Sequence, residues 1–162
     1  MMGRNDRSKI AFVVIGVIVL SRMTFPVAVH LFLRKDNNIL LLRRFNTGYE
    51  DGNYSVIAGH IDGGEDVSTA MIREAKEEAG INILPDNLKI VQVMHRKKSD
   101  EERIDCFFIC DNWTGTIEIM EPDKCDELLW VHIDKLPNNT IDYIRAAVDN
   151  YKSDISFSIF GW

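Results

Sequence analysis

The chain has few cysteines, no excess of basic residues and no hydrophobic run of membrane length. Its three cysteines, Cys106, Cys110 and Cys125, form neither a paired disulfide framework nor a zinc-ligand spacing. Reduced thiols in a cytoplasmic protein fit this pattern best. The net charge of −6 gives no overall positive field to attract a nucleic-acid polymer. An acidic protein that binds a polyanionic substrate needs a metal ion and local arginines.

The longest apolar run covers residues 10–20. As a helix it would reach about 16 Å, against the roughly 30 Å of a bilayer core, so we expect no membrane-spanning segment. Basic residues precede the run as in a signal peptide, but residues 21–24 offer no small-x-small cleavage site. Residues 1–22 are therefore interpreted as an N-terminal extension: an added strand, sequence ahead of a true start at Met23, or a weak signal or anchor.

Residues 23–162 have the length of one soluble domain. The composition of the whole chain, 46% hydrophobic and 27% charged, agrees with this interpretation. Apolar patterns predict strands over residues 25–34, 39–45, 54–58, 88–95, 103–110, 116–120 and 128–133. They predict helices over about residues 66–79 and after Pro137, the second capped by Asn139 or Thr140. The loop over residues 59–64 precedes the first helix.

Three acids of the first helix, Glu74, Glu77 and Glu78, recur at helical spacing and fall on one arc of roughly 100°. Carboxylates four residues apart on a helix repel by roughly 0.2–0.5 kcal/mol per pair. A solvated acidic face is the simple explanation. However, the neighbouring face of the helix is apolar and is expected to pack on the core. Shielded carboxylates so close together favour a shared divalent cation, and hard oxygen ligands suit Mg²⁺ or Mn²⁺.

Residues 59–81 resemble the Nudix box, a pattern of nine defined positions at fixed spacing. All of them match, and they are Gly59, Glu65, Arg73, Glu74, Ala75, Glu77, Glu78, Gly80 and Ile81. The chain is thus similar to the Nudix hydrolase superfamily, of which the MutT-like enzymes are members. The resemblance implies an α/β/α sandwich with a mixed β-sheet between helices. One departure is Ile57, where many relatives carry proline.

The resemblance also implies an activity: divalent-metal-dependent hydrolysis of a phosphoanhydride bond in a nucleoside diphosphate linked to another group X. An NTP, a dinucleoside polyphosphate and a nucleotide sugar all belong to this substrate class. Such a pyrophosphohydrolase would use Glu74, Glu77 and Glu78 as catalytic and metal-binding residues. The backbone carbonyl of Ala58 would be a further ligand to Mg²⁺ or Mn²⁺.

Other box positions are expected to be structural. By resemblance, Glu65 and Arg73 brace the loop against the helix, and Gly59 and Gly80 meet backbone requirements. The 100° spacing places Arg73 away from the three-acid arc.

Outside the box, the resemblance makes the acidic loop over residues 121–127 a candidate for a further metal ligand or base. Glu121 is the first candidate and Glu127 the second, while a plain acidic turn explains either. Arg43 and Arg44, at the end of the second strand, lie where relatives contact substrate. An exposed strand end is the alternative explanation for both.

Three further features are interpreted as structural. Residues 96–102 read as a solvated hairpin tip, and the histidines of the strands read as core residues. Cys106 and Cys110 alternate onto one face of a strand and are expected to be core thiols. The aromatic tail over residues 157–162 is expected to be docked and to border the substrate pocket.

Two other functions compete with hydrolysis. A Nudix-type domain can be a non-catalytic nucleotide sensor or interaction module, although this chain keeps all the box acids. An isoprenoid diphosphate isomerase would need an activated cysteine, and the cysteines here read as core. A homodimer is compatible with either function.

Overall fold

The structure is a computed structural model and describes residues 24–162, so the interpretations of residues 1–22 lie outside the described residues. The elements along the chain are β1 (Val27–Lys35), β2 (Asn38–Arg44), β3 (Tyr54–Ser55), β4 (Ile57–His60), α1 (Val67–Ala79), the 3-10 helix η1 (Pro85–Asn87), β5 (Lys89–Lys98), β6 (Glu101–Cys110), β7 (Cys125–His132), α2 (Asp142–Lys152) and β8 (Phe157–Phe160).

The strands form a mixed sheet in the order β3-β2-β1-β6-β5-β8, and β4 and β7 join it by pairing with β1 and β2. The β1–β6 and β5–β8 pairs are parallel and the others antiparallel. The β1–β2 hairpin joins two groups of strands, because β2 leaves β1 after two paired residues and continues between β3 and β7. The chain crosses from one group to the other between β3 and β4.

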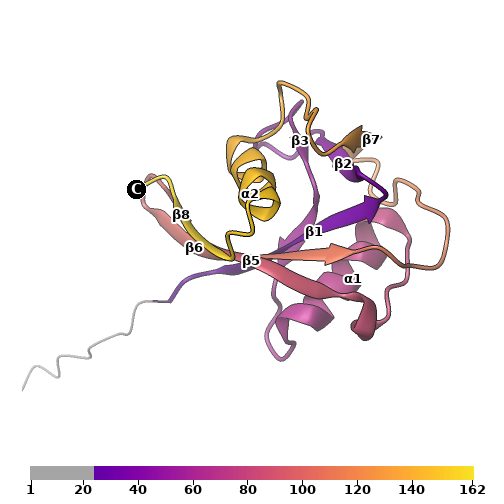
Figure 1. The fold of residues 1–162 in the computed structure, drawn as a ribbon, viewed down its shortest axis with the longest axis horizontal. Helices are drawn as coiled ribbons and strands as arrows, with labels where there is room; N and C mark the ends of the chain where they lie inside the picture. The colour runs from indigo at the N-terminus through magenta and orange to yellow at the C-terminus, as the bar shows by residue number, and fades with distance from the viewer. Residues whose placement is uncertain (1–23) are drawn as a thin grey trace, which may run out of the picture.

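Helices cover opposite faces of this sheet, as expected for an α/β/α sandwich (Figure 1). The reason lies in β1, which is buried on both faces. Its Val29, Leu31 and Leu33 belong to the core under α1. Phe32 belongs to the core under α2. A run of buried residues without polar alternation is typical of a central strand.

Helix α1 begins and ends where the sequence predicts. The Asp66 side chain accepts hydrogen bonds from the N–H groups of Ser68 and Thr69 at 2.8 and 3.0 Å, which satisfies two first-turn donors. Gly80 adopts a left-handed conformation with φ of 71° at the C-terminal end. Ala70, Met71, Ala75 and Ala79 pack this helix on the sheet.

Four local predictions are wrong. Strand β4 continues through Gly59 and His60, which were assigned to the loop. Strands β5 and β6 extend almost to Ser99, so residues 96–98 and 101–102 belong to strands and not to a hairpin tip. Residues 116–120 form no strand. The N-cap of α2 is Ile141, which provides no side-chain cap.

The C-terminal tail docks as β8 along β5, as expected (Figure 1). Phe157, Ile159 and Trp162 remain exposed on it. Cys106, Cys110 and Cys125 are buried free thiols. Within the described part of the chain, no helix has the length and hydrophobicity needed to cross a membrane.

Candidate active site

A cavity of 260 Å³ lies where the chain crosses from β3 to β4. Its walls come from strands β1 to β7, from both α-helices, and from the loops after β2 and before β7. Six residues singled out from the sequence line it, and they are Arg43, Arg44, Ala58, Gly59, Glu78 and Glu121. Residues far apart in the chain therefore meet at one site.

Glu78 is the box acid that reaches this cavity. Its Oε2 atom accepts a hydrogen bond from the N–H of Ala58 at 2.9 Å, which joins α1 to β4. Burial raises the pKa of Glu78 to about 8, against the lowering effect of that hydrogen bond. The nearby carboxylates of Glu74 and Glu121 also raise it. The site thus holds a carboxyl group whose ionisation a cation would favour.

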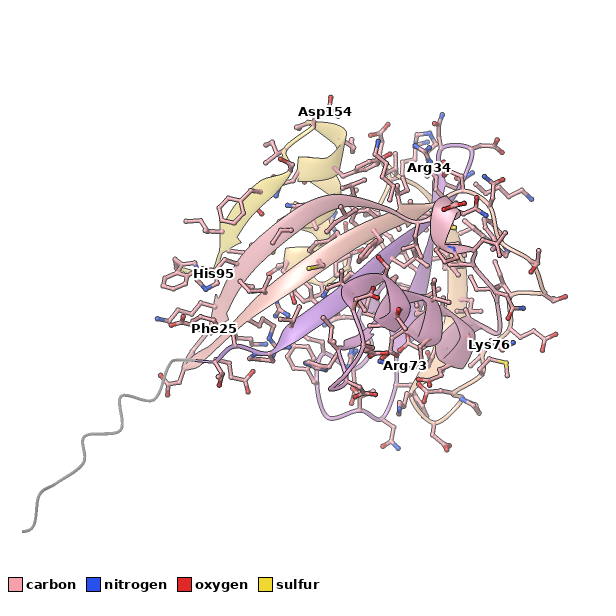
Figure 2. All side chains as sticks on the ribbon, turned by 90° about the horizontal axis from the view of Figure 1, so that it is seen from below. Phe25, Arg34, Arg73, Lys76, His95 and Asp154 are labelled. Carbon is pink, nitrogen blue, oxygen red and sulfur yellow. The ribbon has the colours of Figure 1, made fainter. Side chains whose placement is uncertain are left out.

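Glu74 and Glu77 are both held by Arg73. The Arg73 Nη1 atom lies 2.7 Å from Oε1 of Glu74 and 3.1 Å from Oε2 of Glu77. Figure 2 shows Arg73 on α1 among carboxylate oxygens. The expectation that Arg73 faces away from the acids is wrong, because its long side chain curls back over the arc. Glu74 is partly buried, and this burial raises its pKa although Arg73 opposes the shift.

Arg73 also joins the helix to the preceding loop. Its Nη2 donates to Oε1 of Glu65 at 2.7 Å and to the carbonyl of His60 at 3.0 Å. Glu65 in turn accepts from the N–H of Asp62 at 2.8 Å. These contacts of Arg73 and Glu65 match the brace between the loop and the helix that the family resemblance implied.

Gly59 leaves room for the Glu74 carboxylate. A Cβ atom at position 59 would lie 1.9 Å from Oε1 and 2.0 Å from Cδ of Glu74, well inside van der Waals contact. The backbone of β4 and the side chain of α1 therefore meet only because residue 59 has no side chain.

The two acidic candidates before and in β7 differ in position. Glu121 lines the cavity and pairs with Lys124, with Oε1 and Nζ 2.8 Å apart. Glu127 accepts a hydrogen bond from the Tyr54 hydroxyl at 2.8 Å and pairs with Arg43. Glu121 therefore shares the site with Glu78, whereas Glu127 is engaged at its side.

The two arginines of β2 differ in the same way. All three guanidinium nitrogens of Arg43 contact carboxylates: Nε and Nη2 contact Asp126, and Nη1 contacts Glu127. Arg44 donates to the Tyr49 carbonyl at 2.7 Å and to the Thr47 hydroxyl at 3.1 Å. Because its direct hydrogen-bond partners are neutral oxygens and not carboxylates, Arg44 is the better placed of the two to meet a phosphate.

Sequence reasoning missed a buried charged network in the cavity wall. Arg96 from β5 donates through Nε to the fully buried Asp105 of β6, and Nε2 of His30 from β1 lies 3.2 Å from the same carboxylate. The Arg96 guanidinium lies over the Tyr143 ring at 3.8 Å. Gln92, Met94 and Arg96 lie on one face of β5, and all three are buried. Their spacing of two residues is the signal that the sequence offered for a shared face.

The carboxylates around Glu78 are the candidate ligands for a metal ion. Within residues 24–162, no three His, Cys, Asp or Glu side chains come together as a metal-binding group. Two of the three box acids, Glu74 and Glu77, instead pair with Arg73. The donor chemistry nevertheless fits a divalent cation, because Glu74 and Glu121 both raise the pKa of Glu78 and a cation would relieve that repulsion.

The fold and the glutamate-bearing helix define an α/β/α domain built around a carboxylate site. A family model described as the NUDIX domain matches residues 24–150. The chain belongs to this family, and it is a Nudix hydrolase of the pyrophosphohydrolase class.

Two curated relatives and one solved structure are similar to this chain. An ADP-ribose pyrophosphatase of Methanocaldococcus jannaschii is 30% identical over 125 residues, which cover 76% of this chain and 71% of that protein. The NAD-capped RNA hydrolase NudC of Shigella dysenteriae is 30% identical over 105 residues, covering 65% of this chain and 38% of NudC. The chain therefore spans well under half of that relative.

The structure of a MutT NUDIX hydrolase from Burkholderia pseudomallei superposes with a TM-score of 0.72. The two share 25% sequence identity, and the match covers 78% of this chain and 98% of that one. This agreement supports the α/β/α arrangement described above.

Proposed function

We propose that this protein hydrolyses a phosphoanhydride bond in a nucleoside diphosphate linked to a group X, with a divalent cation, Mg²⁺ or Mn²⁺. The observation that carries the proposal is Glu78, a partly buried carboxylate at the cavity wall whose pKa is raised to about 8. The names of the relatives, which refer to ADP-ribose and to NAD-capped RNA, agree with this substrate class.

The cation would be held by Glu78 and Glu74, with Glu121 on the facing loop and the carbonyl of Ala58 beside them. Glu77 would join this set after release from Arg73. When bound, such an ion supplies a water molecule of lowered pKa and neutralises charge on the phosphoryl oxygens.

The residues of the chain would position the substrate around that ion. Arg44 would contact the diphosphate from β2, while Arg43 keeps the start of β7 in place through its two acidic partners. The Glu65–Arg73 brace would hold the loop over residues 61–66 against α1. The backbone N–H of Ala58 would keep the Glu78 carboxylate pointed at the cavity.

A substrate panel with and without metal tests the proposal. ADP-ribose, ADP-glucose, a dinucleoside polyphosphate and NTPs are incubated with Mg²⁺, with Mn²⁺ and with chelator, and product release is measured. Glu78→Gln should lower kcat by about 100-fold or more, because the carboxylate charge is lost at the reacting centre. Glu118→Gln, an exposed acid outside the cavity, is the matched control.

Turnover that survives both chelator and Glu78→Gln would refute the proposal. Tight nucleotide binding without turnover of any substrate would favour the sensor instead, and the pairing of Arg73 with Glu74 and Glu77 is the observation consistent with that outcome.

A further inference from the structure

Five basic residues of the described chain line the cavity that contains Glu78, and they are Arg43, Arg44, Arg96, Arg103 and Lys124. The partners of the four arginines lie outside the proposed metal site. Asp126, Asp105 and Glu101 pair with three of them. The fourth, Arg44, donates to neutral oxygens. Lys124 differs from all four, because its partner is Glu121, an acid that we propose as a metal ligand.

The ammonium group of Lys124 lies at the carboxylate end of the cavity. Its Nζ atom donates to Oε1 of Glu121 at 2.8 Å. This hydrogen bond raises the pKa of Lys124, and the charges of Glu121, Glu78 and Glu74 raise it further. An exposed lysine–glutamate pair is usually a weak surface interaction. Here the ammonium group also acts on two box acids, so it offsets part of the negative charge of the site in the metal-free protein.

The backbone of Lys124 is held in place, whereas its side chain can move. The N–H of Lys124 donates to the carbonyl of Glu121 at 2.9 Å, and the carbonyl of Lys124 accepts from the N–H of Phe45 at 2.8 Å. Because Phe45 directly follows Arg44, the side chains of Lys124 and Arg44 start from neighbouring backbone segments, and both line the cavity. The Lys124 side chain is 63% exposed, and its four-carbon stem can change rotamer without moving the loop.

Glu121 cannot serve Lys124 and a divalent cation equally well. Two positive charges attract a carboxylate more strongly than one does, and they repel a neighbouring ammonium group. Lys124 would therefore leave Glu121 when a divalent cation is bound there. The next anion within the cavity would be the diphosphate of the substrate, which Arg44 contacts in the proposed function.

We propose that Lys124 is a further substrate-binding residue, which pairs with Glu121 in the metal-free protein and turns to the substrate diphosphate beside Arg44 once a divalent cation is held there. This inference rests on the proposed function. It assigns two opposite effects to one ammonium group. Lys124 weakens metal binding in the absence of substrate, and it strengthens substrate binding in the presence of metal. A lysine that only anchors its loop would have neither effect.

The first test is calorimetric titration of the substrate-free protein with Mn²⁺. Lys124→Met keeps a long unbranched side chain and removes the charge. It should bind Mn²⁺ about 3- to 10-fold more tightly than wild type, because the competing cation is lost. Lys135→Met, at an exposed lysine outside the cavity, changes the net charge equally and should leave the affinity unchanged. An affinity of Lys124→Met that is equal to or weaker than that of wild type would overturn the inference.

The second test is KM for ADP-ribose at saturating Mg²⁺. It should rise by about 10-fold in Lys124→Met, because a charge-assisted contact to the diphosphate is lost. Lys124→Arg retains the positive charge and should keep KM within about 3-fold of wild type. An unchanged KM in Lys124→Met, or an equal rise in both variants, would also overturn the inference.

Failure of the proposed function can be told apart from failure of this inference. If the protein binds Mn²⁺ but turns over no substrate, the proposed function fails, and the affinity for ADP in the presence of Mn²⁺ then decides the inference. ADP should bind about 10-fold more weakly to Lys124→Met than to wild type, and equal affinities would overturn the role of Lys124. If the wild-type protein binds no Mn²⁺, both proposals fail.

Discussion

Gly59→Ala should disable the site while leaving the fold in place. The added Cβ would lie 1.9 Å from the Glu74 carboxylate, and ordinary van der Waals contact begins near 3.4 Å. The carboxylate must therefore move by about 1.5 Å. It is the end of a flexible side chain, so it can move without shifting the backbone of β4.

The movement has two costs of different size. Displacing Glu74 weakens its 2.7 Å pair with Arg73 and forces a new rotamer, and together these should lower the free energy of unfolding by about 1–2 kcal/mol. The effect on activity should be larger, because a misplacement of about 1 Å at a reacting centre can cost roughly 100-fold in rate. We expect kcat/KM to fall by about that factor.

The assay is steady-state hydrolysis of ADP-ribose with Mg²⁺, together with urea unfolding of the same preparations. Gly63→Ala is the matched control, since a Cβ at position 63 meets nothing within 4 Å. It should leave both activity and stability near those of wild type. Wild-type activity in Gly59→Ala would refute the reasoning, because it would mean that the position of Glu74 does not matter.

Two pH-dependent predictions follow from buried carboxylates. The pKa of Asp105 is about 2, because His30 and Arg96 together outweigh the raising effect of burial. Its stabilising contribution should be complete above about pH 3.8 and lost as pH falls toward 2, and urea unfolding from pH 2 to 5 should show this. Asp105→Asn should abolish this pH dependence and lower the free energy of unfolding by about 3–5 kcal/mol, since Arg96 then lacks its counter-charge. A difference in stability between wild type and variant that stays constant from pH 5 to pH 2 would contradict the prediction. For Glu78, burial raises the pKa from 4.5 to about 8, so the folded metal-free protein binds more protons than the unfolded chain between these values. The stability of the metal-free protein should therefore decline from pH 4.5 to 8, and Glu78→Gln should remove that decline. A flat profile in the wild type would contradict this second prediction.

Local chemistry made much of the fold predictable from the sequence. Helix α1 carries its own start and stop signals in Asp66 and Gly80, and it covers the residues predicted for it. Residues 116–120 show the limit of such signals, because an apolar stretch without a strand partner forms no strand. The predicted N-cap of α2 was wrong for a related reason. Backbone hydrogen bonding to Tyr54 fixes the chain at Ile141, and the helix therefore begins after Thr140.

The site was predictable only as far as the box extends. Spacing along one helix located Glu78, and the resemblance located Ala58 across from it. The direction in which the Arg73 side chain bends depends on Glu65 and on the carbonyl of His60. Long-range pairing placed Arg96 in the wall, because three strands from distant parts of the chain had to be aligned first.

The buried carboxylate of Asp105 bears on how those three strands find their alignment. It contacts partners on both flanking strands, Arg96 on β5 and His30 on β1. A slip of β6 by one residue would turn this carboxylate to the opposite face of the sheet and leave a guanidinium and an imidazole facing apolar side chains. Folding intermediates with misaligned strands would thus be higher in free energy, and Asp105 favours the correct pairing of the central strands.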